Sequence, residues 1–387
     1  MKIAARMQDI APFHVMELMA RAQALEAQGR SVIHMEVGEP DFPTPEPIVA
    51  AAREFIADGR VFYTHALGLP LLREAIAAFY AERYGVAVGA ERIVVTAGAS
   101  GALLLALGVL LDAGDEILLT DPGYPCNRHF ARLYEARSRA IEVGPATQYQ
   151  PTAAQVRDHW GPQTRALLVA SPANPTGTML DEAALRQIHA AVAARGGILL
   201  VDEIYHGLTY GEEAVTALNL GDDVFVINSF SKYFSMTGWR LGWLVAPRHF
   251  LRDIEKLAQN LFIAPSTPAQ HAALAAFTPE TIAILEDRRR EFRARRDILL
   301  PGLRRLGFRI AAEPRGAFYI YADVSALSED SFGLAGALID EAGVAATPGI
   351  DFGDASPARY MRFAYTVAGE KLEEGLIRIE RFLARRR

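Results

Sequence analysis

The sequence predicts an α/β protein, in which a three-layer large domain with a mostly parallel sheet is joined to a smaller α+β domain. The first observation is that short apolar runs alternate with helical segments from about residue 46 to residue 280. The second is that these runs are almost wholly hydrophobic, which is typical of strands covered on both faces. The third is that strand-like pieces and helices are mixed after residue 280. The apolar runs that matter most are 92–96, 116–120, 165–170, 198–201 and 224–228.

The two ends of the chain predict the smaller domain. Helical spacing of apolar residues over 15–29 precedes a strand-like stretch at 31–37 and a turn at 38–43. A charged helix is predicted at 286–300 and a final helix at 372–385, with strands at 308–311, 318–322 and 360–364. We therefore expect a large domain at 46–280 and a small domain built from the N-terminal arm, 1–45, together with 281–387.

Composition excludes several classes of protein. The 387 residues are 51% hydrophobic and 22% charged with a formal net charge of −6, so no basic surface for nucleic acid or for an anionic membrane is expected. The longest apolar stretch, 101–111, is too short to span a bilayer. A single cysteine, Cys126, rules out an internal disulfide and a cysteine-rich metal site, and no metal is predicted. With no secretion signal evident near the N-terminus, we expect a cytoplasmic protein.

Polar residues follow every predicted strand of the large domain. Ligands bind outside the carboxyl ends of the strands in open α/β sheets, so these segments should form one site. In chain order they are Gly98-Ala99-Ser100-Gly101, Asp121-Pro122-Gly123-Tyr124, Ser171-Pro172-Ala173-Asn174-Pro175-Thr176-Gly177, Asp202-Glu203-Ile204-Tyr205, and Ser229-Phe230-Ser231-Lys232 with Arg240 eight residues on.

Each of these residues has an ordinary structural explanation. Asn174 before a proline is typical of a turn, Asp202 could cap a helix, and Tyr124, Tyr205 and Arg240 could be packing or surface residues. Their occurrence together in this order favours a functional site. The lysine adds weight, because the chain has only four lysines, at 2, 232, 256 and 371.

The segments 171–177, 201–205 and 229–240 resemble those of class I/II aminotransferases, and the similarity extends from Gly38-Glu-Pro-Asp-Phe42 through Tyr63 to Arg362. The resemblance implies fold type I of the pyridoxal-5'-phosphate (PLP) enzymes. It also implies a homodimer with sites at the interface and a lysine Schiff base.

The resemblance assigns roles to individual residues. Lys232 would bind the cofactor aldehyde and move protons, because lysine is the side chain that forms an imine and can later act as a base. Asp202 would keep the pyridine nitrogen protonated; a pair at about 4 Å and an effective dielectric near 20 interacts by roughly 4 kcal/mol. Asn174 and Tyr205 would donate to the phenolic oxygen of the ring, and Tyr124 would stack on its face.

The remaining roles concern the cofactor phosphate and the substrate. Phosphate ligands are expected from the turn Ala99-Ser100-Gly101, from Ser229, Ser231 and Arg240, and from Tyr63 of the second subunit. Substrate contacts are expected from Gly38, Asn174, Arg362 and Phe318, with Arg362 as the partner of the α-carboxylate.

These features predict a PLP-dependent aminotransferase that moves the α-amino group of an amino acid to a 2-oxo acid. Phe262 stands where some dicarboxylate-specific relatives carry an arginine, so we expect a neutral or hydrophobic donor. A lyase, decarboxylase or synthase on the same scaffold stays open, as does a non-catalytic PLP-binding regulatory domain. A nicotinamide dehydrogenase is excluded, because no G-x-G-x-x-G turn follows the first strand.

Overall fold

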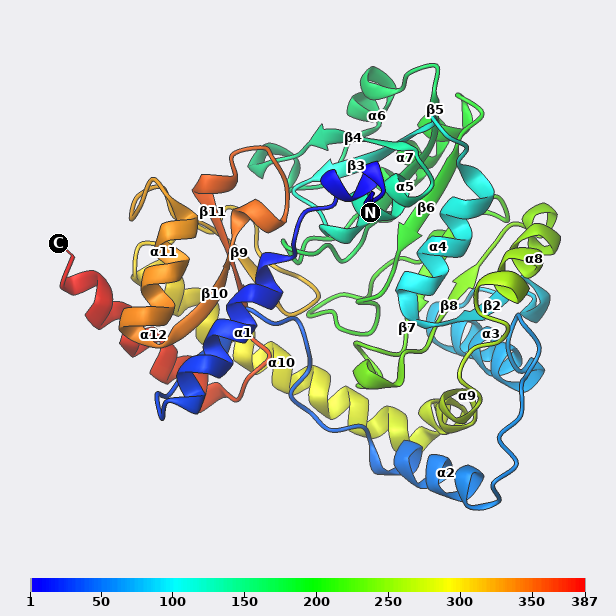
Figure 1. The fold of residues 1–387 in the computed structure, drawn as a ribbon, viewed down its shortest axis with the longest axis horizontal. Coiled ribbons are helices and arrows are strands. Elements are labelled where there is room, and N and C mark those ends of the chain that lie inside the picture. Colours follow the sequence, from blue (N-terminus) through cyan, green and yellow to red (C-terminus); the bar gives the residue numbers. More distant parts are fainter. Residues whose placement is uncertain (1, 387) are drawn as a thin grey trace.

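The computed structural model describes residues 2–386, which form two sheets flanked by helices (Figure 1). The larger sheet has seven strands in the order β2-β8-β7-β6-β5-β3-β4 and the smaller has four in the order β1-β10-β11-β9. The strands are β1 (Ile33–Met35), β2 (Ile93–Thr96), β3 (Glu116–Asp121), β4 (Arg137–Glu142), β5 (Thr164–Ala170), β6 (Ile198–Asp202), β7 (Phe225–Ser229), β8 (Gly242–Val245), β9 (Tyr319–Asp323), β10 (Val344–Pro348) and β11 (Tyr360–Ala364).

All five predicted strands of the large sheet are present, as β2, β3, β5, β6 and β7. Two further strands were not predicted. The strand β4 lies at the edge of the sheet and is mostly exposed and polar, so it lacks the hydrophobic signature of a central strand. The strand β8 runs antiparallel between β2 and β7, so the sheet is mixed at this end and parallel elsewhere.

The helices cover both faces of the large sheet. Side chains alternate along each strand, so Val94, Leu168 and Ile227 pack against α4, α5 and α8. The opposite side chains, such as Leu118 and Val201, pack in the core that contains α3, α6 and α7. The helices are α1 (His14–Ala27), α2 (Glu46–Ala57), α3 (Pro70–Tyr84), α4 (Gly98–Leu110), α5 (Cys126–Leu133), α6 (Ala153–His159), α7 (Glu182–Ala193), α8 (Leu251–Leu261), α9 (Thr267–Leu274), α10 (Pro279–Arg305), α11 (Ser331–Ala337) and α12 (Gly369–Ala384).

The smaller sheet combines both ends of the chain. Strand β1 from the N-terminal arm pairs in parallel with β10, while β10, β11 and β9 are antiparallel. The strand predicted at 308–311 is wrong: only Arg309 forms an isolated bridge, to Asp323. Strand β10 was not predicted.

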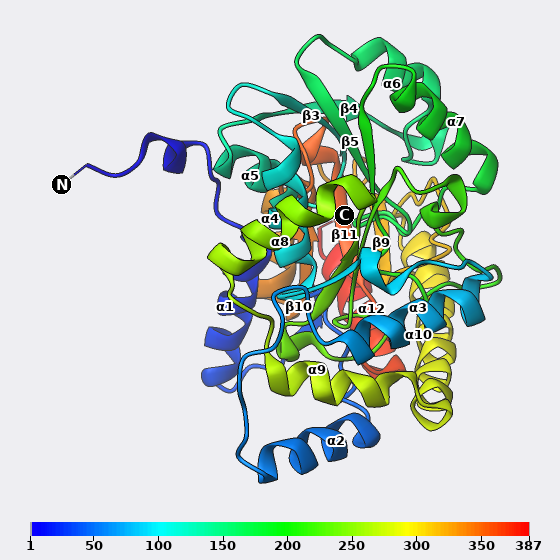
Figure 2. The ribbon, with the colours of Figure 1, turned by 90° about the vertical axis from the view of Figure 1, so that its right-hand side faces the viewer.

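Helix α10 connects the two parts of the molecule. It extends over 27 residues, longer than the predicted 286–300, and begins after Thr278, whose hydroxyl accepts the Thr281 N–H as an N-cap. Figure 1 shows α10 running from the smaller sheet toward α9, and Figure 2 shows the N-terminal segment extending away from the body. We propose that the domain boundary lies near residue 280, with residues 1–45 belonging to the small domain.

Within residues 2–386, no helix is long and apolar enough to cross a membrane.

Candidate active site

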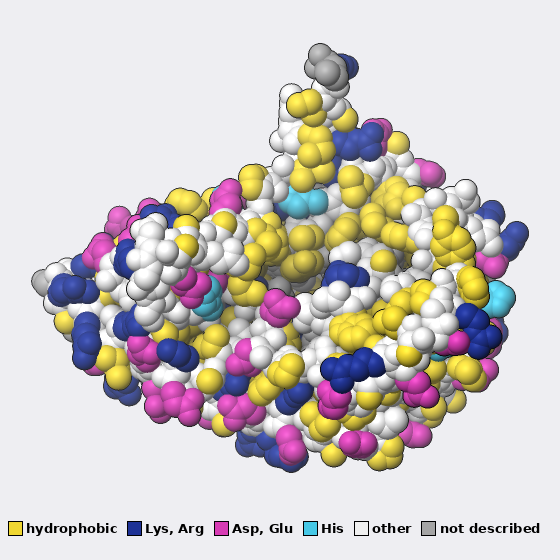
Figure 3. All heavy atoms as spheres, turned by 60° about the horizontal axis from the view of Figure 1, so that its bottom comes forward, with side chains coloured by type: hydrophobic (Ala, Val, Ile, Leu, Met, Phe, Trp, Pro, Cys, Tyr) yellow, Lys and Arg dark blue, Asp and Glu magenta, His cyan; other side chains and the backbone are white. Residues whose placement is uncertain are grey.

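A cavity of about 270 Å³ lies at the carboxyl ends of the large-sheet strands, and it brings together most of the residues predicted from the sequence. Figure 3 shows a hollow face of the molecule where hydrophobic side chains gather around a basic one. The predicted residues that line the cavity are Gly38, Ala99, Ser100, Tyr124, Asn174, Asp202, Tyr205, Ser229, Ser231, Lys232, Arg240 and Arg362.

Three predicted residues do not line this cavity. Gly101 lies in the first turn of α4 and is buried against Thr96 and Ala97. Phe318 is fully buried, with its ring beneath the Lys232 ammonium at 5.8 Å. Tyr63 is 81% exposed and does not line the cavity.

Lys232 follows β7, and its partly buried side chain points into the cavity. Its Nζ donates a hydrogen bond to the Gly38 carbonyl at 2.7 Å. Burial lowers the pKa of Lys232 to about 8; the charge of Glu39 opposes this decrease, whereas those of Arg362 and Arg240 add to it. A substantial fraction of the amine is therefore neutral near physiological pH.

Asp202 is the last residue of β6 and is buried. Its Oδ1 accepts the Ile204 N–H at 3.0 Å. Burial raises the pKa of Asp202 to about 6, while this hydrogen bond and the charge of Lys232 act in the opposite direction. A turn rather than a helix follows, so the alternative that Asp202 is a helix cap is wrong.

The N-terminus of α4 and three polar side chains form an anion-binding corner. The helix begins at Gly98, where free backbone N–H groups and the helix dipole favour negative charge. The Ser229 hydroxyl donates to Ser231 at 2.9 Å, so both hydroxyls lie together. The Arg240 guanidinium lies close enough to Gly98 that a Cβ there would be 3.0 Å from Nη2. Such a corner suits a phosphate.

Arg362 lies on β11 and is only 2% exposed. Its Nη1 donates to Asn174 Oδ1 at 2.9 Å, and its Nη2 donates to the Glu36 carbonyl. The guanidinium carbon is 4.2 Å from the Tyr319 ring centroid and 4.8 Å from that of Phe352. Between residues 2 and 386 no carboxylate forms an ion pair with Arg362, and its buried Nε has no partner. A buried cation held by neutral groups is suited to an anionic ligand.

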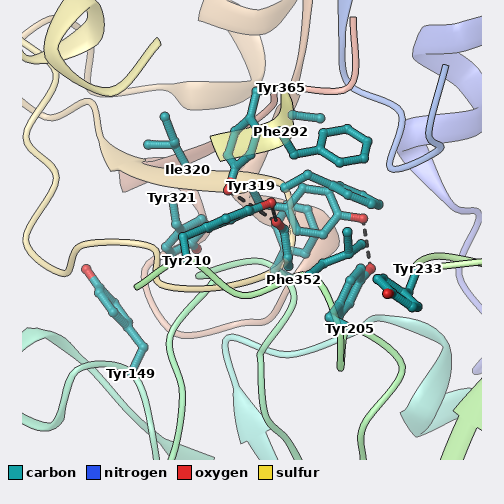
Figure 4. Packing of buried hydrophobic residues seen from close by; sticks show 14 of the residues in the cluster. Tyr149, Tyr205, Tyr210, Tyr233, Phe292, Tyr319, Ile320, Tyr321, Phe352 and Tyr365 are labelled. Carbon is teal, nitrogen blue, oxygen red and sulfur yellow. Dashed lines mark hydrogen bonds between the residues drawn. The ribbon is translucent and has the colours of Figure 1, made fainter. Parts of the chain in front are cut away.

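Several residues of the cavity were missed by sequence reasoning. The Tyr205 hydroxyl is 2.9 Å from that of Tyr319, and both rings point toward each other in Figure 4. The alternation of β9 places Tyr319, not its neighbour Phe318, on the cavity wall, and this period of two was the available signal. The arm also contributes residues for which no local motif exists: Phe13, Val15, Met16 and Val37. Three more lie inside the recognised segments but had no predicted role: Glu39, Ile204 and Thr237.

The fold and the sequence are similar to those of known aminotransferases. The chain is 39% identical over 376 residues to a valine–pyruvate aminotransferase of Mycobacterium tuberculosis, covering 97% of each chain. It is 34% identical over 386 residues to an aspartate/prephenate aminotransferase of Thermus thermophilus, covering 99% of each.

Solved structures agree with these relatives. A crystal structure of an aminotransferase from Mycobacterium tuberculosis superposes with a TM-score of 0.96 at 38% identity, covering 100% of both chains. An aspartate aminotransferase from Thermus thermophilus with maleate gives 0.93 at 33% identity, covering 99% of this chain and 100% of that one. A family model for aminotransferase class I and II matches residues 30–379. The chain therefore belongs to the class I and II aminotransferases, which are PLP-dependent transferases.

Proposed function

We propose that Lys232 is the residue that binds the PLP aldehyde and moves the substrate proton. The observation that carries this proposal is the position of Lys232 Nζ in one cavity with a buried carboxylate, Asp202, and an anion-binding corner. The other three lysines, Lys2, Lys256 and Lys371, do not line the cavity. The burial that lowers the pKa of Lys232 to about 8 supports both roles, because the neutral amine is the nucleophile and the base.

The residues of the cavity fit PLP. Asp202 supplies a buried carboxylate for the pyridine nitrogen, and the corner at Gly98, Ser229, Ser231 and Arg240 suits the phosphate. Tyr124 and Ile204 offer an aromatic and an apolar surface for the ring faces, while Asn174 and Tyr205 would meet the phenolic oxygen. When bound, PLP withdraws electrons from the Cα of an attached amino acid.

The protein residues supply binding and proton transfer. Arg362 binds the donor α-carboxylate, with Asn174 and the Glu36 carbonyl fixing the orientation of its guanidinium. Lys232 Nζ, as a neutral amine, would take the proton from the substrate Cα, hold it, and release it later in the transfer. Asp202 stays ionised near neutral pH, since its pKa of about 6 lies below 7 even without a cationic partner at the ring.

We propose a neutral, hydrophobic amino donor. Three cations line the cavity within the described chain, Lys232, Arg240 and Arg362, and each already has a role. The remaining wall includes Phe13, Val15, Met16 and Val37, which offer no partner for a side-chain carboxylate. The valine–pyruvate relative supports this substrate class. Phe262 lies outside the wall and contacts α4 instead, so the sequence argument based on it carries little weight.

We also propose a homodimer with shared sites. Exposed apolar side chains at Val61, Phe62 and Tyr63, together with Leu261 and Ile263, favour a protein interface. Tyr63 of one subunit would then reach the phosphate corner of the other.

The single cysteine favours a reducing compartment, and we propose the cytoplasm.

A substrate survey tests the proposed donor. The purified holoenzyme is mixed with single amino acids, and the visible spectrum is followed through a half-reaction and back with 2-oxo acids. We expect reversible conversion with valine, leucine or alanine and a higher kcat/KM than with aspartate. Aspartate as the best donor by tenfold or more would overturn the donor class. Release of ammonia or carbon dioxide without reversal would instead favour a lyase or decarboxylase.

A further inference from the structure

A second group of buried titratable residues lies directly behind Asp202. Glu203 is fully buried and His206 is 4% exposed, and both belong to the turn that follows β6. Neither residue lines the cavity. Burying a carboxyl group and an imidazole without a role in binding is costly unless they satisfy each other.

The hydrogen bonds determine where the protons of this pair lie. His206 Nε2 is 3.1 Å from the Ser171 carbonyl, which can only accept, so Nε2 carries a hydrogen. Nδ1 of His206 forms no hydrogen bond within the described part of the chain, and Glu203 Oε2 lies 3.3 Å from it. A neutral imidazole would present a lone pair there to an ionised carboxylate, which is repulsive. One proton must therefore lie between the two residues.

The surroundings favour the carboxyl group as its carrier. Oε1 of Glu203 accepts the Ala217 N–H at 2.6 Å, and the Thr216 hydroxyl lies 2.9 Å from both carboxyl oxygens. Because Oε1 already accepts a backbone N–H, a proton on this carboxyl group belongs on Oε2, the oxygen that lies 3.3 Å from His206 Nδ1. Burial raises the pKa of Glu203 to about 8 and lowers that of His206 to about 3.

The charged and titratable neighbours do not reverse this assignment. Asp202 lies on the same turn, and its negative charge further raises the pKa of Glu203. From α3, the tyrosines Tyr80 and Tyr84 have pKa values raised by burial and are neutral. Arg83, also on α3, pairs with Glu286 at 3.1 Å and with Glu213 at 3.3 Å, and its charge lowers the pKa of His206.

We propose that Glu203 is a protonated carboxylic acid that donates to His206 Nδ1, and that this neutral pair is a positioning device for the substrate-binding residues. The His206 Nε2–H holds the Ser171 carbonyl at the start of the loop that carries Asn174. Asn174 in turn accepts from Arg362. The pair thereby fixes the guanidinium proposed to bind the donor carboxylate, and a neutral Glu203 leaves Asp202 as the charged one of these two neighbouring carboxyl groups.

This proposal rests on the aminotransferase site, and its first test is independent of activity. Histidine is labelled with ¹⁵N in the wild-type holoenzyme, and His206 is assigned by the loss of its signals in His206→Phe. We expect a neutral imidazole protonated at Nε2 between pH 5.5 and pH 8. A doubly protonated His206 in this range would overturn the proposal, whatever the identity of the amino donor.

Kinetics of three variants test the positioning role. Glu203→Gln places an amide N–H where the acid proton lies, so we expect its KM for the donor to stay within about twofold of wild type. His206→Phe keeps a ring but loses both hydrogen bonds, so KM should rise about three- to tenfold, with a smaller change in kcat. Tyr84→Phe is the matched control, since its ring packs on His206 at 5.4 Å and its hydroxyl has no partner in the described residues. An equal loss in Glu203→Gln and His206→Phe would contradict a protonated acid.

Discussion

Asp202 illustrates how a functional residue lowers the stability of the fold that contains it. Burial raises its pKa from 3.8 to about 6, so the native apoprotein binds this proton more tightly than the unfolded chain. The free energy of unfolding should therefore decrease as pH rises from about 4 to about 6. Asp202→Asn removes the ionisation. We expect the apo variant to be more stable than the apo wild type above pH 6, by up to about 3 kcal/mol, and the difference to shrink toward pH 4.

Urea unfolding of both apoproteins at equal concentration, at pH 4.5 and pH 7.5, measures this difference. With PLP bound the order should reverse, because the variant has no carboxylate for the pyridine nitrogen. A stability difference that does not depend on pH would show that Asp202 is not buried as an ionised group in the apoprotein.

Arg362 supplies geometry as well as charge. Lysine at this position could not donate to Asn174 and the Glu36 carbonyl while presenting two parallel N–H groups to a carboxylate. For Arg362→Lys we expect KM for the amino donor to rise at least about tenfold, with PLP affinity nearly unchanged. Steady-state kinetics and a PLP titration measure the two quantities. Loss of PLP binding with an unchanged KM would place Arg362 at the cofactor instead.

Residues that follow strands could be predicted from the sequence, because strand ends converge at one edge of the sheet. Lys232, Asp202, Asn174 and Arg240 reach the cavity for this reason. Residues brought there by tertiary packing could not be predicted. Phe13 belongs to an arm far away in sequence, and the contact of Glu203 with His206 depends on how the turn after β6 folds.

At the scale of the elements, the position of α4 depends on Gly242 in β8. A Cβ at this position would lie 2.8 Å from the Gly98 carbon and 2.9 Å from the Ala99 nitrogen, both backbone atoms at the start of α4. Gly242→Ala should push the helix N-terminus away from the sheet, at a cost of about 1 to 3 kcal/mol. Because this N-terminus forms the anion-binding corner, we expect PLP to bind about tenfold more weakly.

Equilibrium titration of the apoprotein with PLP measures this effect. Gly336→Ala in α11 is the control, since nothing lies within 4 Å of its added Cβ and alanine favours a helix. It should leave PLP affinity unchanged. Equal affinities for Gly242→Ala and wild type would mean that α4 does not hold the phosphate.

Strands that are buried on both faces could be predicted from the sequence, whereas exposed strands could not. Central strands such as β6 are hydrophobic on both faces and were found, whereas β4, with the sequence Arg-Ser-Arg-Ala-Ile-Glu, is exposed and was not. The apolar run at 308–311 suggested a strand, but Phe308 instead fills the core against Phe363, with ring centroids 5.2 Å apart. A short apolar run does not distinguish a strand from a loop that packs into a core.

At the scale of the whole molecule, the proposed role of the exposed Tyr63 means that activity should depend on dimer formation. Two variants that we expect to be impaired, Lys232→Ala and Tyr63→Ala, are unfolded together, refolded and allowed to form hybrid dimers. Random pairing of equal amounts makes half of the dimers hybrids. If each site combines Lys232 of one subunit with Tyr63 of the other, each hybrid has one intact site out of two. We expect recovery of about a quarter of the wild-type activity. Recovery to no more than the level of the separate variants would contradict shared sites.

The attachment of the cofactor tests the central claim most directly. The holoenzyme is reduced with borohydride, digested, and the modified peptide is identified by mass spectrometry, with Lys232→Ala as the matched variant. We expect the label on Lys232 alone, and in the variant no visible band from attached cofactor and a proton-transfer rate lower by at least about 10² to 10⁴. A label on Lys2, Lys256 or Lys371, or an unchanged spectrum in Lys232→Ala, would contradict the account.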